Sequence, residues 1–319
     1  MALHEHTAER DCFRLDLDEK PPDRARGAVL TIGNFDGVHL GHASLVRELM
    51  AQAKRAGGPA VVVSFDPHPL QILAPEQFMP VLTTVEERSR LLHELGVDAV
   101  IFLRTDRELL QLSPSEFFQQ IVRRSFQAKG MVEGFNFRFG RDRAGDTDML
   151  AAACRDAAMT FERVPPFSLD GSPVSSSRVR RALLSGDVNE AARLLNRRYR
   201  IRGRVGKGAM RGRTIGFPTA NLEEVSVLLP GDGVYAVRVL ANNQRFIGAA
   251  NIGPNPTFGD DARKMEVHLL DFSGDLYGAE LEVEFLQRVR STTRFRNADE
   301  LIQQLHNDIA AVRQIAAEV

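Results

Sequence analysis

The sequence predicts an α/β domain with a parallel sheet, followed by an all-β antiparallel domain that ends in a helix. Three observations support this prediction. The chain has 319 residues, which favours two domains with separate cores. Up to about Arg198, short apolar segments alternate with segments of helical spacing, which is typical of parallel strands joined by helices. After Tyr199, apolar and polar residues alternate with a period of two, which is typical of antiparallel strands.

The first half contains five short, apolar segments that we expect to be strands. They occupy residues 28–33, 60–65, 98–103, 130–134 and 160–164. After the first strand, apolar residues recur at helical spacing as far as two glycines at 57 and 58. The same spacing occurs over residues 84–96 and 113–126. The last of these segments opens with Ser113, Pro114 and Glu116, a capping box with proline in the first helical position.

The second half contains four segments with alternating polarity, separated by Gly, Asn, Pro and Asp. They span residues 233–240, 246–253, 264–272 and 280–289 and predict an antiparallel barrel or sandwich. A last helix is expected to start at Asn297, with Glu300 in the capping position.

We place the domain boundary between Gly186 and Tyr199, which gives domains of residues 1–190 and 191–319. Five arginines fall between Arg197 and Arg204. The run favours a solvated segment at the junction, with RNA binding as the alternative.

The composition indicates which broad classes of protein are excluded. Lys and Arg number 41 against 42 Asp and Glu, so no global attraction to nucleic acid or membrane is expected. No apolar stretch reaches 18 residues, and the first residues lack the pattern of a signal peptide. Cys12 and Cys154 provide neither a disulfide framework nor a metal-ligand spacing. We therefore expect a cytoplasmic protein.

The motif GNFDGVHLGH at residues 33–42 lies between the first strand and the first helix. Such a turn presents backbone donors and a positive helix end to anions. His39 and His42, separated by a glycine and one other residue, could both donate to phosphate oxygens during an in-line attack at phosphorus. The alternative is structural, with one histidine capping the helix and the other hydrogen-bonded within the sheet.

Three further motifs are expected at the same edge of the sheet or near it. FDPHP at 65–69 ends the second strand, and FNFRFG at 135–140 follows a later one and contains Asn136. SSSRVRRALLSGD at 175–187 places hydroxyls, Arg178 and Arg180 at a helix start. These groups either cap the helix and face solvent, or they hold a leaving pyrophosphate.

In this order, the four motifs resemble the adenylyltransferase half of the bacterial bifunctional riboflavin kinase/FAD synthetase family. The resemblance implies a Rossmann-like nucleotidyltransferase fold with the following site: His39 and His42 on the ATP phosphates, Ser176, Ser177 and Arg180 on the triphosphate, Asn136 on the nucleotide, and Asn34 and Asp36 along the site. The family has Thr at the position of Ser177, which keeps the hydroxyl. It often has Asp at the position of Asn136. The asparagine keeps a hydrogen-bond acceptor but lacks the negative charge of the aspartate.

A second set of candidate residues lies beyond the boundary. Residues 206–222 are rich in glycine but lack a Walker motif, and Gly206, Gly208 and Gly216 would let backbone N–H groups approach phosphates. Thr219 and Asn221 offer neutral oxygen ligands, which suit Mg²⁺ bound to ATP. The alternative is a turn stabilised by asparagine.

Strand alternation places Glu266 and His268 on one face of the segment 264–272. A carboxylate near a phosphate loop could accept the proton of a substrate hydroxyl, although a surface carboxylate is the alternative.

The motifs GRTIGFPTANL, AANIGPNPTF and MEVHLLDF resemble, in this order, the riboflavin kinase domain of the same family. The resemblance implies that Thr219 and Asn221 hold Mg–ATP and that Glu266 is the general base for the terminal ribityl hydroxyl of riboflavin. Two positions depart from the family pattern, which has Arg where this chain has Asn255 and Glu where it has Thr292. Both departures concern the positioning of the flavin loops.

The two resemblances together imply a bifunctional enzyme that phosphorylates riboflavin to FMN and adenylylates FMN to FAD and pyrophosphate. Its expected partners are ATP, riboflavin, FMN and FAD, with Mg²⁺ accompanying ATP and with no nucleic acid or membrane. Two alternatives remain at this point: an enzyme like the class I aminoacyl-tRNA synthetases, and a flavin-binding carrier with inactive sites. The sequence does not indicate an oligomeric state.

Overall fold

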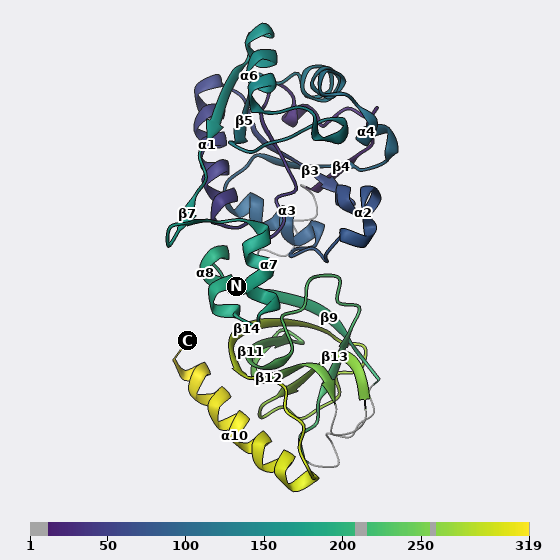
Figure 1. Cartoon of the computed structure of the whole chain (residues 1–319), viewed down its shortest axis with the longest axis vertical. Helices are drawn as coiled ribbons and strands as arrows, with labels where there is room; N and C mark the ends of the chain where they lie inside the picture. The colour runs from purple at the N-terminus through teal and green to yellow at the C-terminus, as the bar shows by residue number, and fades with distance from the viewer. Residues whose placement is uncertain (1–11, 208–215, 256–259, 319) are drawn as a thin grey trace. The chain divides into compact units, whose positions relative to one another are not determined.

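The computed structural model describes residues 12–207, 216–255 and 260–318, with side chains at 255 and 260–262 left aside (Figure 1). The chain divides into two compact units, an N-terminal unit of residues 12–79 and 83–175 and a C-terminal unit that includes 80–82 and runs from Ser176 onward. The boundary between independently functioning domains, placed between Gly186 and Tyr199, remains a prediction.

The N-terminal unit is built on a parallel sheet of six strands in the order β1-β4-β3-β2-β5-β6. The strands are β1 (Cys12–Leu15), β2 (Val29–Ile32), β3 (Ala60–Asp66), β4 (Ala99–Arg104), β5 (Gly130–Gly134) and β6 (Thr160–Val164). All five pairings between these strands are parallel, which confirms the predicted sheet. The edge strand β1 was not predicted, because it is only four residues long.

Helices cover both faces of this sheet (Figure 1). They are α1 (Leu40–Ala56), α2 (Pro69–Leu73), α3 (Val85–Glu94), α4 (Arg107–Gln111), α5 (Pro114–Phe117), the π-helical η4 (Phe118–Ser125) and α6 (Thr147–Asp156), with short 3-10 turns η2 (Asp23–Ala25), η3 (Pro75–Gln77) and η5 (Arg141–Arg143). A small hairpin, β7 (Ser168–Leu169) and β8 (Ser172–Pro173), ends the unit. The predicted capping box at Ser113 and Glu116 is confirmed.

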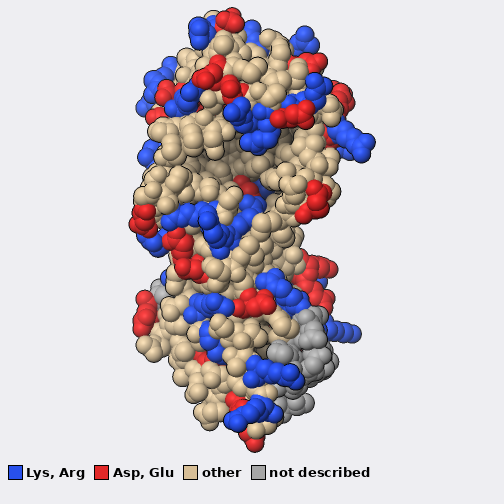
Figure 2. All heavy atoms as spheres, viewed as in Figure 1, with Lys and Arg blue, Asp and Glu red and all other residues tan. Residues whose placement is uncertain are grey.

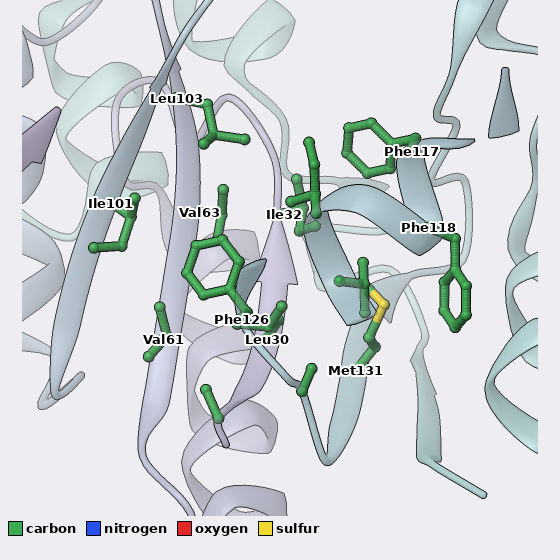
Figure 3. Packing of buried hydrophobic residues seen from close by; sticks show 14 of the residues in the cluster. Leu30, Ile32, Val61, Val63, Ile101, Leu103, Phe117, Phe118, Phe126 and Met131 are labelled. Atoms are coloured by element: carbon green, nitrogen blue, oxygen red, sulfur yellow. The ribbon is translucent and has the colours of Figure 1, made fainter. Parts of the chain in front are cut away.

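Successive strand residues enter two separate cores, which explains why the strands read as continuous apolar runs. On one face, Leu30, Ile32 and Val63 pack against the aromatic side chains of the α5–η4 segment and Phe126 (Figure 3). On the other face, Val29 and Val62 pack against α1 and α3. Both faces of the sheet are therefore buried, and the strand ends are where polar side chains can gather.

The C-terminal unit is a closed antiparallel barrel in the order β10-β13-β12-β11-β14-β9. Its strands are β9 (Arg200–Gly206), β10 (Ala220–Glu223), β11 (Gly233–Ala241), β12 (Gln244–Asn255), β13 (Asp260–Leu269) and β14 (Glu280–Arg290). The barrel is closed, so the sandwich that the alternating polarity also allowed is excluded. A closed barrel has no exposed sheet edges. Inward residues such as Val237, Val267 and Phe285 are fully buried.

The arginine run is a barrel strand rather than an irregular junction segment. In β9, Ile201 and Val205 face the core while Arg200, Arg202 and Arg204 are exposed. Arg202 donates to Glu282 of β14 at 2.8 and 2.9 Å, and Arg200 lies 3.2 Å from the same carboxylate. The charges hid a period of two, but their side chains are solvated and ion-paired, so the run has a structural explanation without RNA.

The described residues of the C-terminal unit include the helices α7 (Ser176–Leu184), α8 (Val188–Leu195) and α10 (Ala298–Ala317). Asn297 caps α10 by accepting the Glu300 N–H at 2.9 Å, as predicted. Asp308 of α10 is 2 % exposed and binds Arg290 of β14 at 2.8 to 3.0 Å, which ties this helix to the barrel.

On the visible surface, basic and acidic side chains are interspersed rather than separated into fields of one sign (Figure 2). Within the N-terminal unit this face is hollowed, and mostly uncharged atoms line the hollow (Figure 2). Across the described residues, none of the helices is long and apolar enough to cross a membrane.

We predict that a fragment of residues 176–319 is more stable than one of residues 199–319. The Gly231 N–H donates to the Leu183 carbonyl at 2.8 Å, and Leu194 and Leu195 of α8 are buried. Each such leucine is worth about 1.5–3 kcal/mol when buried. The shorter fragment should melt at least about 5 °C lower by calorimetry. Equal melting temperatures would show that α7 and α8 do not support the barrel.

Candidate functional site

The first candidate site lies where the order of strands in the N-terminal sheet reverses. β2 is flanked by β3, which follows it along the chain, and by β5, which comes later. Ligands of open α/β sheets bind at the carboxyl ends of the strands at such a switch point. The turn after β2 carries Asn34, Asp36, His39 and His42, and Asn136 follows β5. The structure therefore brings these five predicted residues to one edge of the sheet.

The two histidines form a stacked pair at the start of α1. Their ring centroids are 3.7 Å apart, with an angle of 14° between the planes. His39 is the N-cap residue of α1, and its Nδ1 accepts the backbone N–H of His42 at 3.3 Å. In the neutral ring this assignment places the proton on Nε2, so capping and donation use different nitrogen atoms. The predicted cap and the predicted donor role are thus compatible in one side chain.

Close packing explains the glycine between the histidines. A Cβ at Gly41 would lie 3.1 Å from Cε1 and Nδ1 of His39 and 3.1 Å from the Val174 carbonyl oxygen. Any larger residue would therefore push against the His39 ring or the backbone. Phe35, Gly37 and Val38 have φ of 47°, 84° and 40°, so the turn uses the left-handed region at three positions. Such a strained backbone persists only when its surroundings hold it.

Asp36 holds the turn from inside the protein. Its side chain is 2 % exposed, and its Oδ1 accepts the Thr83 backbone N–H at 3.1 Å and the Thr83 hydroxyl at 3.3 Å. The Gly37 N–H donates to the Thr83 hydroxyl oxygen at 3.1 Å. The Arg88 guanidinium, also buried, lies 3.8 Å from the Asp36 carboxylate. This geometry suits a residue that positions the turn.

Arg88 extends the network to the neighbouring strand. It donates to the Ser64 hydroxyl at 3.2 Å, and Ser64 donates to the Asn34 carbonyl at 3.1 Å. Sequence reasoning missed Arg88 and Thr83. One signal was present: Arg88 shares a helical stripe with Leu91 and Leu92, which are buried in α3.

Asn136 borders a cavity of about 400 Å³ within the N-terminal unit. The side chains of Phe135 and Asn136 are exposed there, and Arg138 and Arg163 line the same cavity. Both arginines have acidic partners, since Arg138 lies 3.7 Å from Asp146 and Arg163 pairs with Asp148. The cavity continues the edge of the sheet beyond β5.

Ser176 and Ser177 occupy the first turn of α7, as the sequence predicted for a helix start. Arg178 binds Glu190 of α8 at 2.6 Å, and Arg180 donates to the Pro80 carbonyl at 3.5 Å. All of these residues belong to the C-terminal unit. The role of Ser176, Ser177 and Arg180 on the triphosphate therefore remains a prediction.

The second candidate site is a row of residues across four barrel strands. Asn221 of β10 lies opposite Gly206 of β9 on one side and Glu266 of β13 on the other. Glu266 in turn lies opposite Asn251 of β12. Directly opposite residues have Cβ atoms about 5 Å apart, so these side chains emerge side by side. Asn251 was not singled out from the sequence, because alternation does not reveal which strands pair.

Gly206 accommodates a neighbouring carboxylate. A Cβ at this position would lie 2.0 to 2.3 Å from the carboxyl atoms of Glu223, so only glycine leaves that side chain in place. Gly216 has a φ of 85°, a left-handed conformation that favours glycine. Gly208 lies outside the described residues, as does the side chain of Asn255. The Thr292 hydroxyl is buried, with no hydrogen-bond partner among the described residues.

Two cavities adjoin the segment 216–219, which carries Thr219. One, of about 440 Å³, is lined by Gly216, Phe217, His268, His306 and Arg313 among others. The other, of about 270 Å³, is lined by Thr219, Phe272 and Tyr277 among others. His268 Nδ1 lies 2.7 Å from the Pro218 carbonyl oxygen, which fastens this segment to β13. The barrel therefore has two cavities next to the segment 216–219.

The comparisons with known proteins agree with this two-site arrangement. A FAD synthetase family model matches residues 22–178, and a Riboflavin kinase family model matches residues 195–316. The bifunctional riboflavin kinase/FMN adenylyltransferase of Pseudomonas fluorescens is 41 % identical over 293 residues, which cover 92 % of this chain and 94 % of the relative. Its namesake from Escherichia coli K12 is 38 % identical over 300 residues, covering 94 % and 95 %.

A solved structure extends the likeness to the fold of the whole chain. It is described as a macrolide-efflux protein from Streptococcus pneumoniae and is 33 % identical, with a TM-score of 0.84, covering 95 % of this chain and 98 % of that one. The resemblance predicted from the motifs is confirmed, and the matching families are not those of the aminoacyl-tRNA synthetases. The chain belongs to the family of bifunctional riboflavin kinases/FMN adenylyltransferases, with its FAD synthetase domain first and its riboflavin kinase domain second.

Proposed function

We propose that the family's two reactions take place at the two candidate sites described above. The N-terminal unit transfers AMP from ATP to FMN at the histidine turn, and the barrel phosphorylates riboflavin beside Glu266. The observation that carries the proposal is that Asn221 and Glu266 are direct cross-strand neighbours in the barrel, while the stacked histidines lie at the start of α1, at the switch point of the N-terminal sheet. Each reaction thus has its own set of polar groups.

In adenylyl transfer, a phosphate oxygen of FMN attacks the α-phosphorus of ATP, and the bond to the bridging oxygen of pyrophosphate breaks. No proton must be removed from a phosphate oxygen that is already ionised, so the step needs charge stabilisation rather than a base. His39, His42 and the N-terminal N–H groups of α1 supply it. Ser176, Ser177 and Arg180 hold the triphosphate, Asn136 contacts the nucleotide, and Asn34 lies in the exposed part of the turn.

In riboflavin phosphorylation, Glu266 accepts the proton of the terminal ribityl hydroxyl as its oxygen attacks the γ-phosphorus, and ADP leaves. Glu266 is half-buried, so its carboxylate remains accessible from the barrel surface. Both cavities have aromatic side chains in their walls. We assign the one at Thr219 to ATP, because Thr219 is a predicted ligand of Mg–ATP, and the one at Phe217 and His306 to the flavin ring.

The donor set fits a Mg²⁺ ion that arrives with ATP. In the part of the chain that the structure describes, no group of three or more His, Cys, Asp or Glu residues could hold a metal ion. Thr219 and Asn221 would contribute a hydroxyl and an amide oxygen, which suit a cation whose charge is already balanced by phosphates. When bound, the ion neutralises charge on the transferred phosphoryl group.

The most direct test is to incubate the protein with riboflavin, ATP and Mg²⁺ and to separate riboflavin, FMN and FAD by chromatography. Sequential appearance of FMN and FAD is expected. Flavin binding without turnover of ATP would instead support the carrier with inactive sites.

We predict that His42→Ala lowers conversion of FMN to FAD by roughly 10- to 100-fold, because a charge-assisted hydrogen bond to phosphate contributes about 1.5–3 kcal/mol. His39→Asn should retain the helix cap and the melting temperature yet also lose FAD formation, which separates the two functions of His39. Conversion of riboflavin to FMN should be unchanged in both variants. Normal FAD formation in the folded double variant His39→Asn with His42→Ala would refute the phosphate role.

We predict that Glu266→Gln lowers FMN formation by about 100-fold or more, since the amide keeps the shape but does not accept the proton. FAD formation from supplied FMN should stay near the wild-type rate. Glu280→Gln is the matched control, because Glu280 is an exposed carboxylate on β14 of the same barrel. If both variants phosphorylate riboflavin normally, Glu266 is a surface residue.

We predict that Arg88→Met destabilises the N-terminal unit by about 3–5 kcal/mol, because it leaves the buried Asp36 carboxylate without its cation. FAD formation should fall with it, and riboflavin phosphorylation should not. Arg90→Met is the control: Arg90 is on the same helix but forms partly exposed ion pairs with Glu87 and Glu94, so its loss should cost less than about 1 kcal/mol. Denaturant titration would measure both, and equal losses would contradict the buried-pair interpretation.

A further inference from the structure

A carboxyl group that the mechanism does not use lies at the switch point of the N-terminal sheet. The ladder between β2 and β5 pairs Val29 with Gly130 and ends with Leu30 and Met131. The next available donor on β2, the Ile32 N–H, is accepted by Oε1 of Glu133 at 2.8 Å. A side chain of β5 therefore replaces a backbone carbonyl in the ladder.

Glu133 is only 1 % exposed, which is unusual for a glutamate. Within the described residues, no ion pair joins it to a cation. Its sheet partner on β6 is Arg163, but that guanidinium binds Asp148 of α6. The thiol of Cys154, also on α6, is the other titratable group facing it, while α1 packs on the opposite face of β5.

These surroundings favour the neutral carboxylic acid. Burial raises the pKa of Glu133 well above 4.5, because desolvation of the charged form outweighs the hydrogen bond from Ile32. Burial also raises the pKa of the Cys154 thiol to about 12, so this neighbour stays uncharged as well. A neutral acid can still accept the Ile32 N–H through its carbonyl oxygen.

We propose that Glu133 is a positioning residue for adenylyl transfer: by accepting the Ile32 N–H it ends the β2–β5 ladder and holds the turn 33–39 open at the switch point. Ile32 directly precedes this turn. On the other side of β2, the Gly33 N–H donates to the Val63 carbonyl at 3.0 Å. The start of the turn is thus fastened to β3 by backbone and to β5 by a side chain, and the two strands can diverge where the ligand binds.

Replacing Glu133 by an apolar residue can have two consequences, and both disturb the turn. The Ile32 N–H either stays buried without an acceptor, or β5 moves towards β2 to supply a backbone carbonyl and narrows the crevice. Glutamine avoids both, because its amide oxygen accepts the same N–H. The comparison of Glu133→Gln with Glu133→Met, an unbranched side chain of similar length, therefore isolates the hydrogen bond.

The inference rests on the proposed phosphate role of the histidine turn. We expect Glu133→Met to lower kcat/KM for FAD formation by roughly 10- to 100-fold at a temperature where calorimetry shows it fully folded, and Glu133→Gln to stay within about threefold of wild type. Riboflavin phosphorylation should be unchanged in both. The control is Thr31→Val, which alters a fully buried β2 side chain on the opposite face, whose hydroxyl has no hydrogen-bond partner in the described structure. It should leave FAD formation unchanged.

Wild-type FAD formation in folded Glu133→Met, or a tenfold loss in Glu133→Gln, would overturn the inference. Should Glu133→Met not fold, Glu133→Gln and Thr31→Val decide by the same thresholds. His42→Ala is assayed in parallel: if it is also fully active, the proposed function fails, and if it alone loses activity, only the role of Glu133 fails.

The neutral form of Glu133 can be tested separately, through the pH dependence of the protein's stability. Folding raises this pKa, so the fold binds more protons than the unfolded chain, and the stability contributed by Glu133 decreases as pH rises above about 4.5. Glu133→Gln removes this dependence, so its melting temperature should exceed that of wild type by a margin that grows from pH 5 to pH 8. A margin that is constant with pH would overturn the neutral assignment.

Discussion

The buried contact between Asp36 and Arg88 is the constraint on which the first site depends. The turn after β2 has three residues with positive φ, two of them not glycine, and short-range preferences alone do not favour that backbone. This backbone is held by contacts among three residues whose side chains are almost completely buried: Asp36, Thr83 and Arg88. Because one partner lies in the turn and the others lie at the start of α3, the position of the histidines depends on how α3 packs against the sheet.

The same principle operates in the barrel with different means. Here the candidate groups stand on adjacent strands, so the ladder itself fixes the spacing of Gly206, Asn221, Glu266 and Asn251. The segment before β10 is irregular, and the contact of His268 with the Pro218 carbonyl fastens it. Rigid elements thus hold the groups that need accurate spacing in both units, and specific side-chain contacts secure the loops between them.

Periodicity predicted the architecture of this chain because both sheets follow the elementary rules closely. Runs such as 60–65 are buried on both faces, whereas burial alternates along residues 280–285, and this difference distinguishes a parallel from an antiparallel sheet. The sequence did not reveal β9, where outward arginines concealed the alternation, nor β1, which is short. Motif order predicted the residues at the strand ends. The sequence did not indicate the roles of three residues, Arg88, Asn251 and Glu133. Their environments depend on which distant elements come into contact, and local spacing carries little information about such contacts.

His39 shows why a structural and a functional interpretation of one residue need not compete. Its Nδ1 caps α1, and this bond fixes the tautomer and the ring orientation, so Nε2 carries the proton. A cap residue such as serine or asparagine would satisfy the same backbone donor but would present no second donor at that distance from the helix. Stacking against His42 and the close approach of Gly41 further restrict the ring. Capping therefore prepares the imidazole for phosphate before any ligand arrives, and the cost of orienting it is met during folding rather than during binding.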